Sequence, residues 1–315
     1  FGAFAFVVLL GTVFPLLVEA LDDRQLSVGE PYFNTMSIPL GIGLLFFMAV
    51  APALPWRASS PQTISDRLRW SALFASAIMA ITVGFGARGI VPVLTYGLGA
   101  FAVGGITRQF VLGWRARRRT KREAWFSSAI RLVRSNPRTY GGLVAHAGIV
   151  CIAIGIAASG SASTQRNIIL AVGDSATVAE HRFTFLGTKK QTTSQKTTVS
   201  VEVQVQHDGR VLGTYAPSVS TFPNSTQAIG TPSVRTGLWR DVYLTVVSSP
   251  TQTGDVTLGV AVRPMMIWIW IGGGVLAIGT FLALLPAHGR GFRIHDVHLV
   301  AEEKSSMLTG PVEHI

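Results

Sequence analysis

Six apolar runs, each long enough to cross a membrane as a helix, constrain the fold of this chain more than any other feature. The hydrocarbon core of a bilayer is roughly 30 Å thick, and about 20 helical residues span it. The runs lie near residues 1–21, 36–54, 68–86, 89–113, 140–159 and 264–285. Charged residues make up only 14% of the chain, against roughly 25% in a soluble domain. The sequence therefore predicts a polytopic α-helical membrane protein with about six transmembrane helices.

The positive charge of the chain is concentrated between two of these runs. Residues 108–138 contain ten Lys or Arg and one acid, Glu123. Such an excess is typical of cytoplasmic loops, so we predict that this segment faces the cytoplasm. Helix parity then puts 287–315 on the same side and 161–262 on the outer side. Because no nucleic-acid recognition fold accompanies the charge, no nucleic-acid partner is predicted.

The segment 161–262 has a different composition and predicts a small all-β domain, a barrel or a sandwich. Residues 197–206 alternate apolar and polar side chains, as a half-buried strand does. Asp208-Gly209 then signals a hairpin turn into 211–215. Further strands are predicted at 182–186, 241–247 and 256–262. The chain thus divides into a membrane domain (1–160), an outer, periplasmic β-domain (161–262), a last transmembrane helix (263–286) and a cytoplasmic tail (287–315).

His146 is the residue best placed to carry chemistry. It alone among the seven histidines lies inside an apolar run, and an ionisable side chain at that depth marks a functional site by default. The small residues Gly142 and Gly148 would let a flat group or another helix approach. A neutral imidazole can ligate haem iron or hydrogen-bond to a neighbouring helix, and the residues leave both readings open. The other six histidines, in polar or loop surroundings, are His181, His207, His288, His295, His298 and His314.

The single cysteine, Cys151, excludes an intrachain disulfide framework, a cysteine-based zinc site and an iron–sulfur cluster. Any redox cofactor would therefore need other ligands.

Two membrane-boundary segments offer possible docking or haem-proximal residues. An outer loop before the second run brings together Glu30, Tyr32 and Asn34. Tyr32 suits an anchor in the interfacial aromatic belt, whereas Glu30 or Asn34 could contact a partner or ligand. Trp268 and Trp270 lie near the outer end of the last helix. They are either belt aromatics or a surface on which a porphyrin edge packs.

Six short motifs occur in a fixed order along the chain. They are LGTVFPL (10–16), SVGEPYFN (27–34), YGGLVAHAG (140–148), RFTF (182–185), RDVY (240–243) and WIWIG (268–272). In this order and spacing the chain resembles the C-terminal half of the CcmF family, the haem-lyase membrane subunit of c-type cytochrome maturation. The resemblance covers nearly all 315 residues.

The resemblance implies a function on the outer face of the bacterial inner (plasma) membrane. Such a protein takes haem from the haem chaperone CcmE and joins it to the Cys-x-x-Cys-His motif of apocytochrome c, which arrives with a CcmH-type thiol reductant. Family members also hold a haem b within the membrane between two histidines on different helices. His146 matches the second of these axial ligands, so the resemblance makes it a ligand of the haem iron.

Other functional parts of the family have no counterpart in this sequence. The first intramembrane histidine, the tryptophan-rich outer segment and both outer-face histidines are missing, and the seven tryptophans are scattered. The chain also opens with Phe1 inside an apolar run. We therefore expect the chain to be either a fragment or one half of a split protein, with these parts on the missing N-terminal half as its partner. We expect this chain alone not to be catalytic. The alternative function is a non-haem membrane scaffold or transporter with a protein-binding β-domain.

Overall fold

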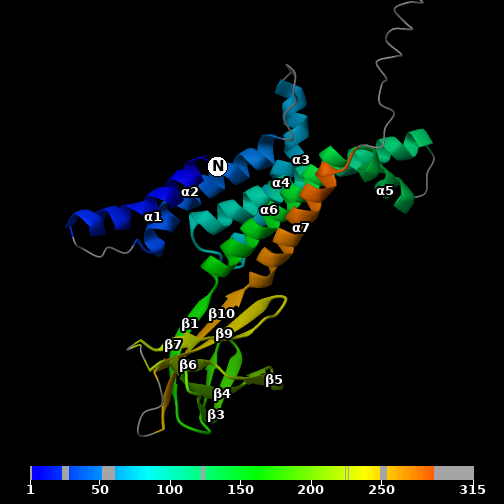
Figure 1. Cartoon of the computed structure of the whole chain (residues 1–315). Helices are drawn as coiled ribbons and strands as arrows, with labels where there is room; N and C mark the ends of the chain where they lie inside the picture. Colours follow the sequence, from blue (N-terminus) through cyan, green and yellow to red (C-terminus); the bar gives the residue numbers. More distant parts are fainter. Residues whose placement is uncertain are drawn as a thin grey trace, which may run out of the picture.

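The computed structural model contains a helical region and a β-domain (Figure 1). It describes residues 2–22, 28–51, 61–121, 125–223, 225, 227–248 and 254–286. The helices are α1 (Gly2–Asp22), α2 (Glu30–Val50), α3 (Pro61–Gly84), α4 (Ile90–Lys121), α5 (Trp125–Ser135), α6 (Pro137–Ser161) and α7 (Met266–Leu284). The strands are β1 (Thr164–Leu170), β2 (Ser175–Val178), β3 (His181–Thr192), β4 (Thr197–His207), β5 (Arg210–Tyr215), β6 (Ser218–Thr221), β7 (Ile229–Thr231), β8 (Ser233–Arg235), β9 (Arg240–Ser248) and β10 (Val256–Pro264).

Five of the described helices, rather than six, are long and apolar enough to cross a membrane: α1, α2, α4, α6 and α7. The run expected at 68–86 is helical, but its apolar part, Leu68–Gly84, is shorter. Gly86 and Gly89, with φ of 87° and 100°, end it in a turn that leads directly into α4. Positive φ suits glycine because it has no Cβ. The chain reverses there before the apolar helix reaches full length.

Two boundaries differ from the sequence-based expectation. α2 begins at Glu30 instead of residue 36, because Pro31 occupies the first helical turn, where its missing N–H is tolerated. Glu30, Tyr32 and Asn34 therefore lie on a helix and not in a loop. The basic segment 108–138 is also largely helical, since α4 continues to Lys121 and α5 follows. Arg and Lys are good helix formers, which explains the extension.

α6 and α7 pack backbone against backbone through glycines. A Cβ atom added at Gly148 would lie 2.5 Å from the backbone nitrogen of Leu276. One added at Gly272 would lie 2.8 Å from the carbonyl oxygen of Gly148. Small residues allow this close approach of membrane helices. The face of α6 that carries Gly141 and Gly148 is therefore in direct contact with the α7 backbone.

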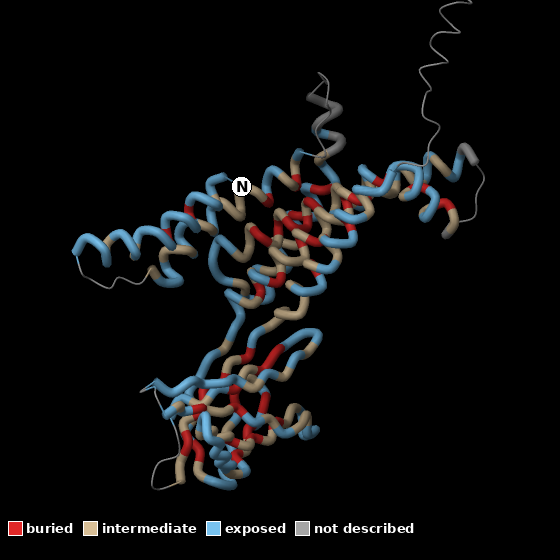
Figure 2. Tube along the Cα trace, in the orientation of Figure 1, coloured by how far each residue is buried: buried red, intermediate tan, exposed pale blue. Residues whose placement is uncertain are grey.

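The β-domain is a sandwich of two antiparallel sheets. Their strand orders are β1-β10-β9-β8 and β2-β3-β4-β6-β7, and β5 pairs with β4. Phe183, Phe185 and Val203 of one sheet and Leu244 and Leu258 of the other form part of a fully buried core. Figure 2 shows buried residues gathered there and between the helices, while the outer surfaces of α1 and α2 are exposed.

The predicted central hairpin of this domain is confirmed. β4 covers the alternating segment, and Asp208 and Gly209 have φ of 49° and 75°, as a type I′ turn requires. The short strands β2, β6, β7 and β8 and the first strand, β1, were not predicted. β1 and β10 pair from Thr164↔Val262 onward. Two residues separate β1 from the end of α6, and Met265 alone separates β10 from α7. Two paired strands thus connect the sandwich to the helices.

Candidate functional site

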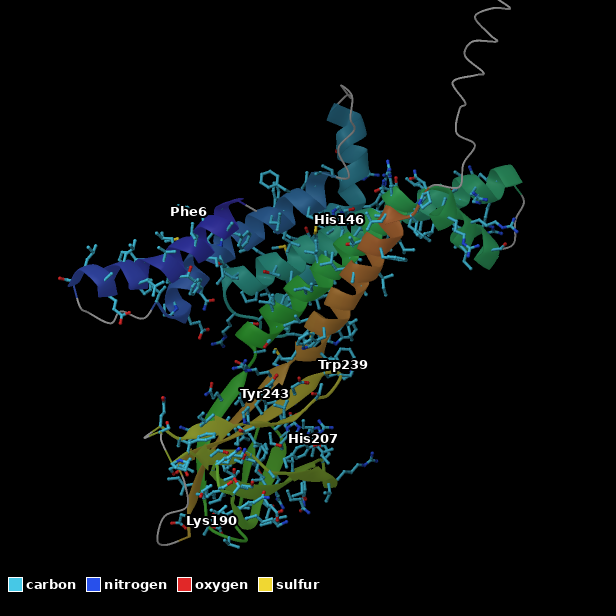
Figure 3. All side chains as sticks on the ribbon, viewed as in Figure 1. Phe6, His146, Lys190, His207, Trp239 and Tyr243 are labelled. Atoms are coloured by element: carbon cyan, nitrogen blue, oxygen red, sulfur yellow. The ribbon has the colours of Figure 1, made fainter. Side chains whose placement is uncertain are left out.

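His146 lies on α6, well inside the apolar part of the helix. Asn136 caps the helix, because its side-chain oxygen accepts a hydrogen bond from the Thr139 backbone N–H at 3.4 Å, and Pro137 occupies the first turn. His146 follows Pro137 by nine residues, which is roughly 14 Å along a helix axis. The helical region that surrounds it is shown in Figure 3.

The His146 ring has an unpaired nitrogen. Within the described residues, its Nδ1 is the one buried side-chain nitrogen or oxygen that lacks a hydrogen-bond partner. An unsatisfied buried polar atom is costly, and in a native protein it calls for a partner that is not yet accounted for. The part of the chain that the structure describes holds no cluster of three His, Cys, Asp or Glu that could bind a metal ion. This imidazole can therefore act as a single axial ligand rather than as part of a protein-only metal site.

The side of α6 that carries His146 has free space. Gly142 lies one turn earlier, and a Cβ atom there would meet no atom within 4 Å. One turn later, Val150 is buried in a cluster with Leu45 and Ala102 from α2 and α4. Open space at Gly142 and packed residues at Val150 thus lie one turn before and one turn after His146. Small residues such as Gly142 permit close approach of a flat group to a membrane helix.

Cys151 does not contribute to this site. Its thiol donates to the carbonyl oxygen of Trp268 at 3.3 Å, across the α6–α7 contact. Trp268 in turn donates from its indole N–H to the carbonyl oxygen of Leu238 at 2.9 Å. Trp268 therefore ties α7 to the β8–β9 loop, a role that the sequence did not indicate. Trp270 is 80% exposed and stands in the position of a belt aromatic.

Glu30, Tyr32 and Asn34, the predicted docking or haem-proximal residues, lie on α2 and form hydrogen bonds within α1 and α2. The Tyr32 hydroxyl donates to the carbonyl oxygen of Val7 on α1 at 3.2 Å, and its ring packs beside Gly11. Asn34 donates to a Glu30 carboxylate oxygen one turn earlier at 3.3 Å. Tyr32 thus joins α1 to α2, and Glu30 and Asn34 form an exposed pair on the first turn.

A pair of histidines lies in the β-domain and was not singled out from the sequence. His181 and His207 are register partners on β3 and β4, and their rings stack with centroids 4.4 Å apart. His181 is 2% exposed, so its expected polar or loop surroundings were wrong. Each Nδ1 lies near a carbonyl oxygen, that of Ala179 at 2.8 Å and that of Glu180 at 3.1 Å. Burial lowers the pKa of His181 below its usual range, an effect that the bond to Ala179 opposes and nearby His207 reinforces.

Known proteins are similar to this chain over about nine-tenths of its length, including the helices and the β-domain. Residues 161–264 match the C-terminal β-sandwich of the CcmF family. The cytochrome c-type biogenesis protein CcmF of Pseudomonas aeruginosa is 31% identical over 289 residues, which cover 91% of this chain and 42% of that protein. The protein of the same name from Escherichia coli is 26% identical over 287 residues, with 90% and 42% covered.

A solved structure agrees with these sequence matches. A cytochrome c haem lyase CcmF superposes with a TM-score of 0.69 at 25% identity, covering 90% of this chain and 44% of that one. The chain spans about two-fifths of the length of these relatives. The resemblance carried by the sequence motifs is confirmed, and the chain is a homologue of the CcmF cytochrome c biogenesis proteins that includes their C-terminal β-sandwich.

Proposed function

We propose that this chain is part of a membrane haem lyase of c-type cytochrome maturation and that His146 is one axial ligand of an intramembrane haem b. The unpaired, buried Nδ1 of His146 is the observation that carries the proposal. The haem lyase named among its relatives supports the same cofactor class. The second axial ligand comes from outside these 315 residues, because no other histidine lies in an apolar run.

The residues around His146 have separate tasks in this proposal. His146 supplies a ring nitrogen to the iron, and Gly142 leaves the approach free. The glycine contacts between α6 and α7 hold α6 in place, so the imidazole is presented from a rigid element. Haem b bound there would supply reversible one-electron chemistry, which suits the reduction of substrate haem iron to Fe(II) that thioether formation requires. The chain acts with its N-terminal partner half, the chaperone CcmE, a CcmH-type reductant and apocytochrome c.

The proposed orientation puts the β-domain on the periplasmic side of the bacterial inner membrane. In Figure 1, α5 and the end of α4 lie at the opposite end of α6 from the β-domain. At this end lie Arg115, Arg117, Arg118 and Arg119 near the end of α4 and Arg131 and Arg134 on α5. The positive-inside rule therefore supports a cytoplasmic α5 and an outer β-domain. A reporter enzyme active only outside the cytoplasm should work when fused after Gly160 and fail when fused after Arg119, and the reverse pattern would overturn the orientation.

The haem assignment is tested in the complex of this chain with its N-terminal half. His146→Ala should lower haem b content and c-type cytochrome yield at unchanged protein level, because a dry site then keeps one protein ligand. His295→Ala should change neither. A His146→Ala complex with a full six-coordinate haem b spectrum would show that the imidazole only packs, as the scaffold alternative requires.

A matched glycine pair tests the open approach independently of the ligand. Gly142 and Gly105 both lie on membrane helices, and a Cβ at either would meet no atom within 4 Å. Gly142→Leu should reduce haem b content because the side chain fills the space beside His146, whereas Gly105→Leu on α4 should leave it unchanged. Equal haem content in the two variants would contradict the proposed approach.

A further inference from the structure

A hollow in the β-domain lies beside the stacked histidines. Its volume is about 310 Å³, near the lower end of the range for ligand pockets. It is lined by Glu180, His181, His207, Leu212, Arg235, Gly237, Leu238, Trp239 and Arg240. The lining thus combines two guanidinium groups and two imidazoles with one carboxylate and three apolar side chains. This composition favours an anionic group carried on an apolar body.

The hollow is built by an unusual turn. Ala179 and Glu180, which join β2 to β3, both have positive φ, 47° and 68°, although neither is glycine or asparagine. Such a conformation is uncommon and is retained only where the surroundings hold it. Here its two carbonyl oxygens receive the Nδ1–H groups of His181 and His207. Because each Nδ1 is held as a donor, each Nε2 is left as the proton-accepting atom of its neutral ring.

The charges around the hollow link both sheets. Arg240, at the start of β9, donates to a Glu180 carboxylate oxygen at 2.6 Å, and this contact holds the pKa of Glu180 below its usual range. Arg235 on β8 lines the same space. Asp208 lies nearby, with its largely exposed carboxylate 3.4 Å from His207 Nε2, but it does not line the hollow. The lining itself therefore holds two guanidinium groups and one carboxylate, an excess of one positive charge with both imidazoles neutral.

The hollow opens close to the N-terminal end of α7, the end that adjoins the β-domain. Trp239 packs on Trp268, with ring centroids 5.9 Å apart, and Figure 3 places Trp239 near the start of that helix. Leu238 and Trp239 nevertheless remain 53% and 63% exposed. Headgroups occupy the layer just beyond the hydrocarbon core, and tryptophans are enriched there. With α7 across the membrane, the rim of the hollow would lie at the depth of lipid headgroups.

We propose that this hollow binds a phosphate-class oxyanion, with the phosphate of an outer-leaflet anionic phospholipid as its occupant. Arg235 and Arg240 contact the oxyanion, a charge-assisted interaction that guanidinium geometry favours. Leu238 and Trp239 cover the apolar part of the lipid. Protonation of His181 turns its Nε2 into a donor, so binding strengthens as pH falls. The proposal concerns the β-domain and does not depend on a haem ligand at His146.

The test uses the full chain in detergent and titrates it with short-chain phosphatidylglycerol, short-chain phosphatidylcholine or inorganic phosphate. We expect phosphatidylglycerol to bind and Arg240→Gln to weaken it by about five- to tenfold. Glu180→Gln should tighten binding, since it frees Arg240 and removes a competing acid. If Arg240 and Glu180 only stabilised the fold, the two substitutions would not change the affinity for phosphatidylglycerol in opposite directions. The affinity of the natural chain for phosphatidylglycerol should also rise as the pH is lowered from 7.5 to 5.5.

Arg166→Gln on β1 is the matched control, since its exposed side chain belongs to the same domain but does not line the hollow. It should leave affinity unchanged. Inorganic phosphate that binds as tightly as the lipid, with the same variant pattern, would support the oxyanion site and assign it a soluble source. Equal weakening by Arg166→Gln and Arg240→Gln, or no anion binding at all, would overturn the proposal.

Discussion

His146 in the helices and His181 in the β-domain each have a buried ring nitrogen, but among the described residues only the His181 Nδ1 has a hydrogen-bond partner. The stacked β-domain rings are each fixed by a carbonyl oxygen, whereas Nδ1 of His146 has none among the described residues. The same side chain is thus satisfied in one region and left with unused bonding capacity in the other. Position in an apolar helix therefore gives one reason to propose a ligand at His146, and the unpaired Nδ1 gives a second, independent reason.

The two regions are also held together by different forces. The β-domain buries large side chains from both sheets in a single core. Helices α6 and α7 instead meet through glycines, because lipid offers no hydrophobic gain for contact between apolar helices. Shortening a buried side chain should therefore destabilise the sandwich most, and replacing a glycine by a larger residue should destabilise the α6–α7 pair most.

The largest expected effect is the loss of a core aromatic in the sandwich. Phe185 is fully buried, so Phe185→Ala should lower the free energy of unfolding of the β-domain by about 3–5 kcal/mol. Phe6→Ala on α1, where the side chain is 62% exposed, should leave the domain unaffected. Amide hydrogen exchange along β4 in the full chain measures the difference, and equal protection in the two variants would contradict it.

A slightly smaller effect is expected from enlarging the helix contact. Gly148→Leu places a side chain against backbone atoms of α7, which cannot move aside, and should cost about 3 kcal/mol. Cys151 provides a native probe because its thiol lies across the same contact. Its alkylation by a membrane-permeable maleimide should accelerate in Gly148→Leu and stay unchanged in Gly105→Leu. Unchanged reactivity in both would show that α7 does not fix α6.

Expression of residues 163–262 alone sharpens the comparison further. The segment contains the whole sandwich core, so we expect it to fold without the helices and to bind no haem. Near-ultraviolet circular dichroism and haem titration check the two parts. A Soret band lost on changing His181 or His207 would mean that the β-domain imidazoles, and not His146 alone, serve haem.

The smallest effect is a pH dependence of β-domain stability. Because burial lowers the pKa of folded His181, the unfolded chain takes up a proton below about pH 6.5 that the folded domain does not. The free energy of unfolding should therefore fall as pH drops from 6.5 toward the lower folded pKa. His181→Phe should flatten that slope in hydrogen exchange between pH 7.5 and 5.5, and Arg166→Gln should preserve it. An identical slope in His181→Phe would assign the dependence to other groups.

Local patterns account for the parts of this molecule that the sequence predicted correctly. The alternation at 197–206, the Asp208-Gly209 turn and most apolar helices are encoded by neighbours in the chain. β8 has three residues, too few for a period to appear. His181 and His207 meet only through strand register, and Trp268 finds Leu238 only through tertiary packing. Features that depend on contacts between residues distant in the sequence could therefore not be predicted from it. The β-domain hollow is such a feature, because residues from several strands line it.

The proposed axial role of His146 is tested most directly by chemical rescue in the complex with the N-terminal half. His146→Gly removes the imidazole and leaves a cavity at the iron. Added imidazole should restore the six-coordinate, low-spin haem b absorption and part of the c-type cytochrome yield, because it fills the vacated coordination position. Imidazole should change nothing in the natural complex. A His146→Gly complex whose spectrum is already six-coordinate without imidazole, or that never binds haem b even when it is supplied, would contradict ligation by His146.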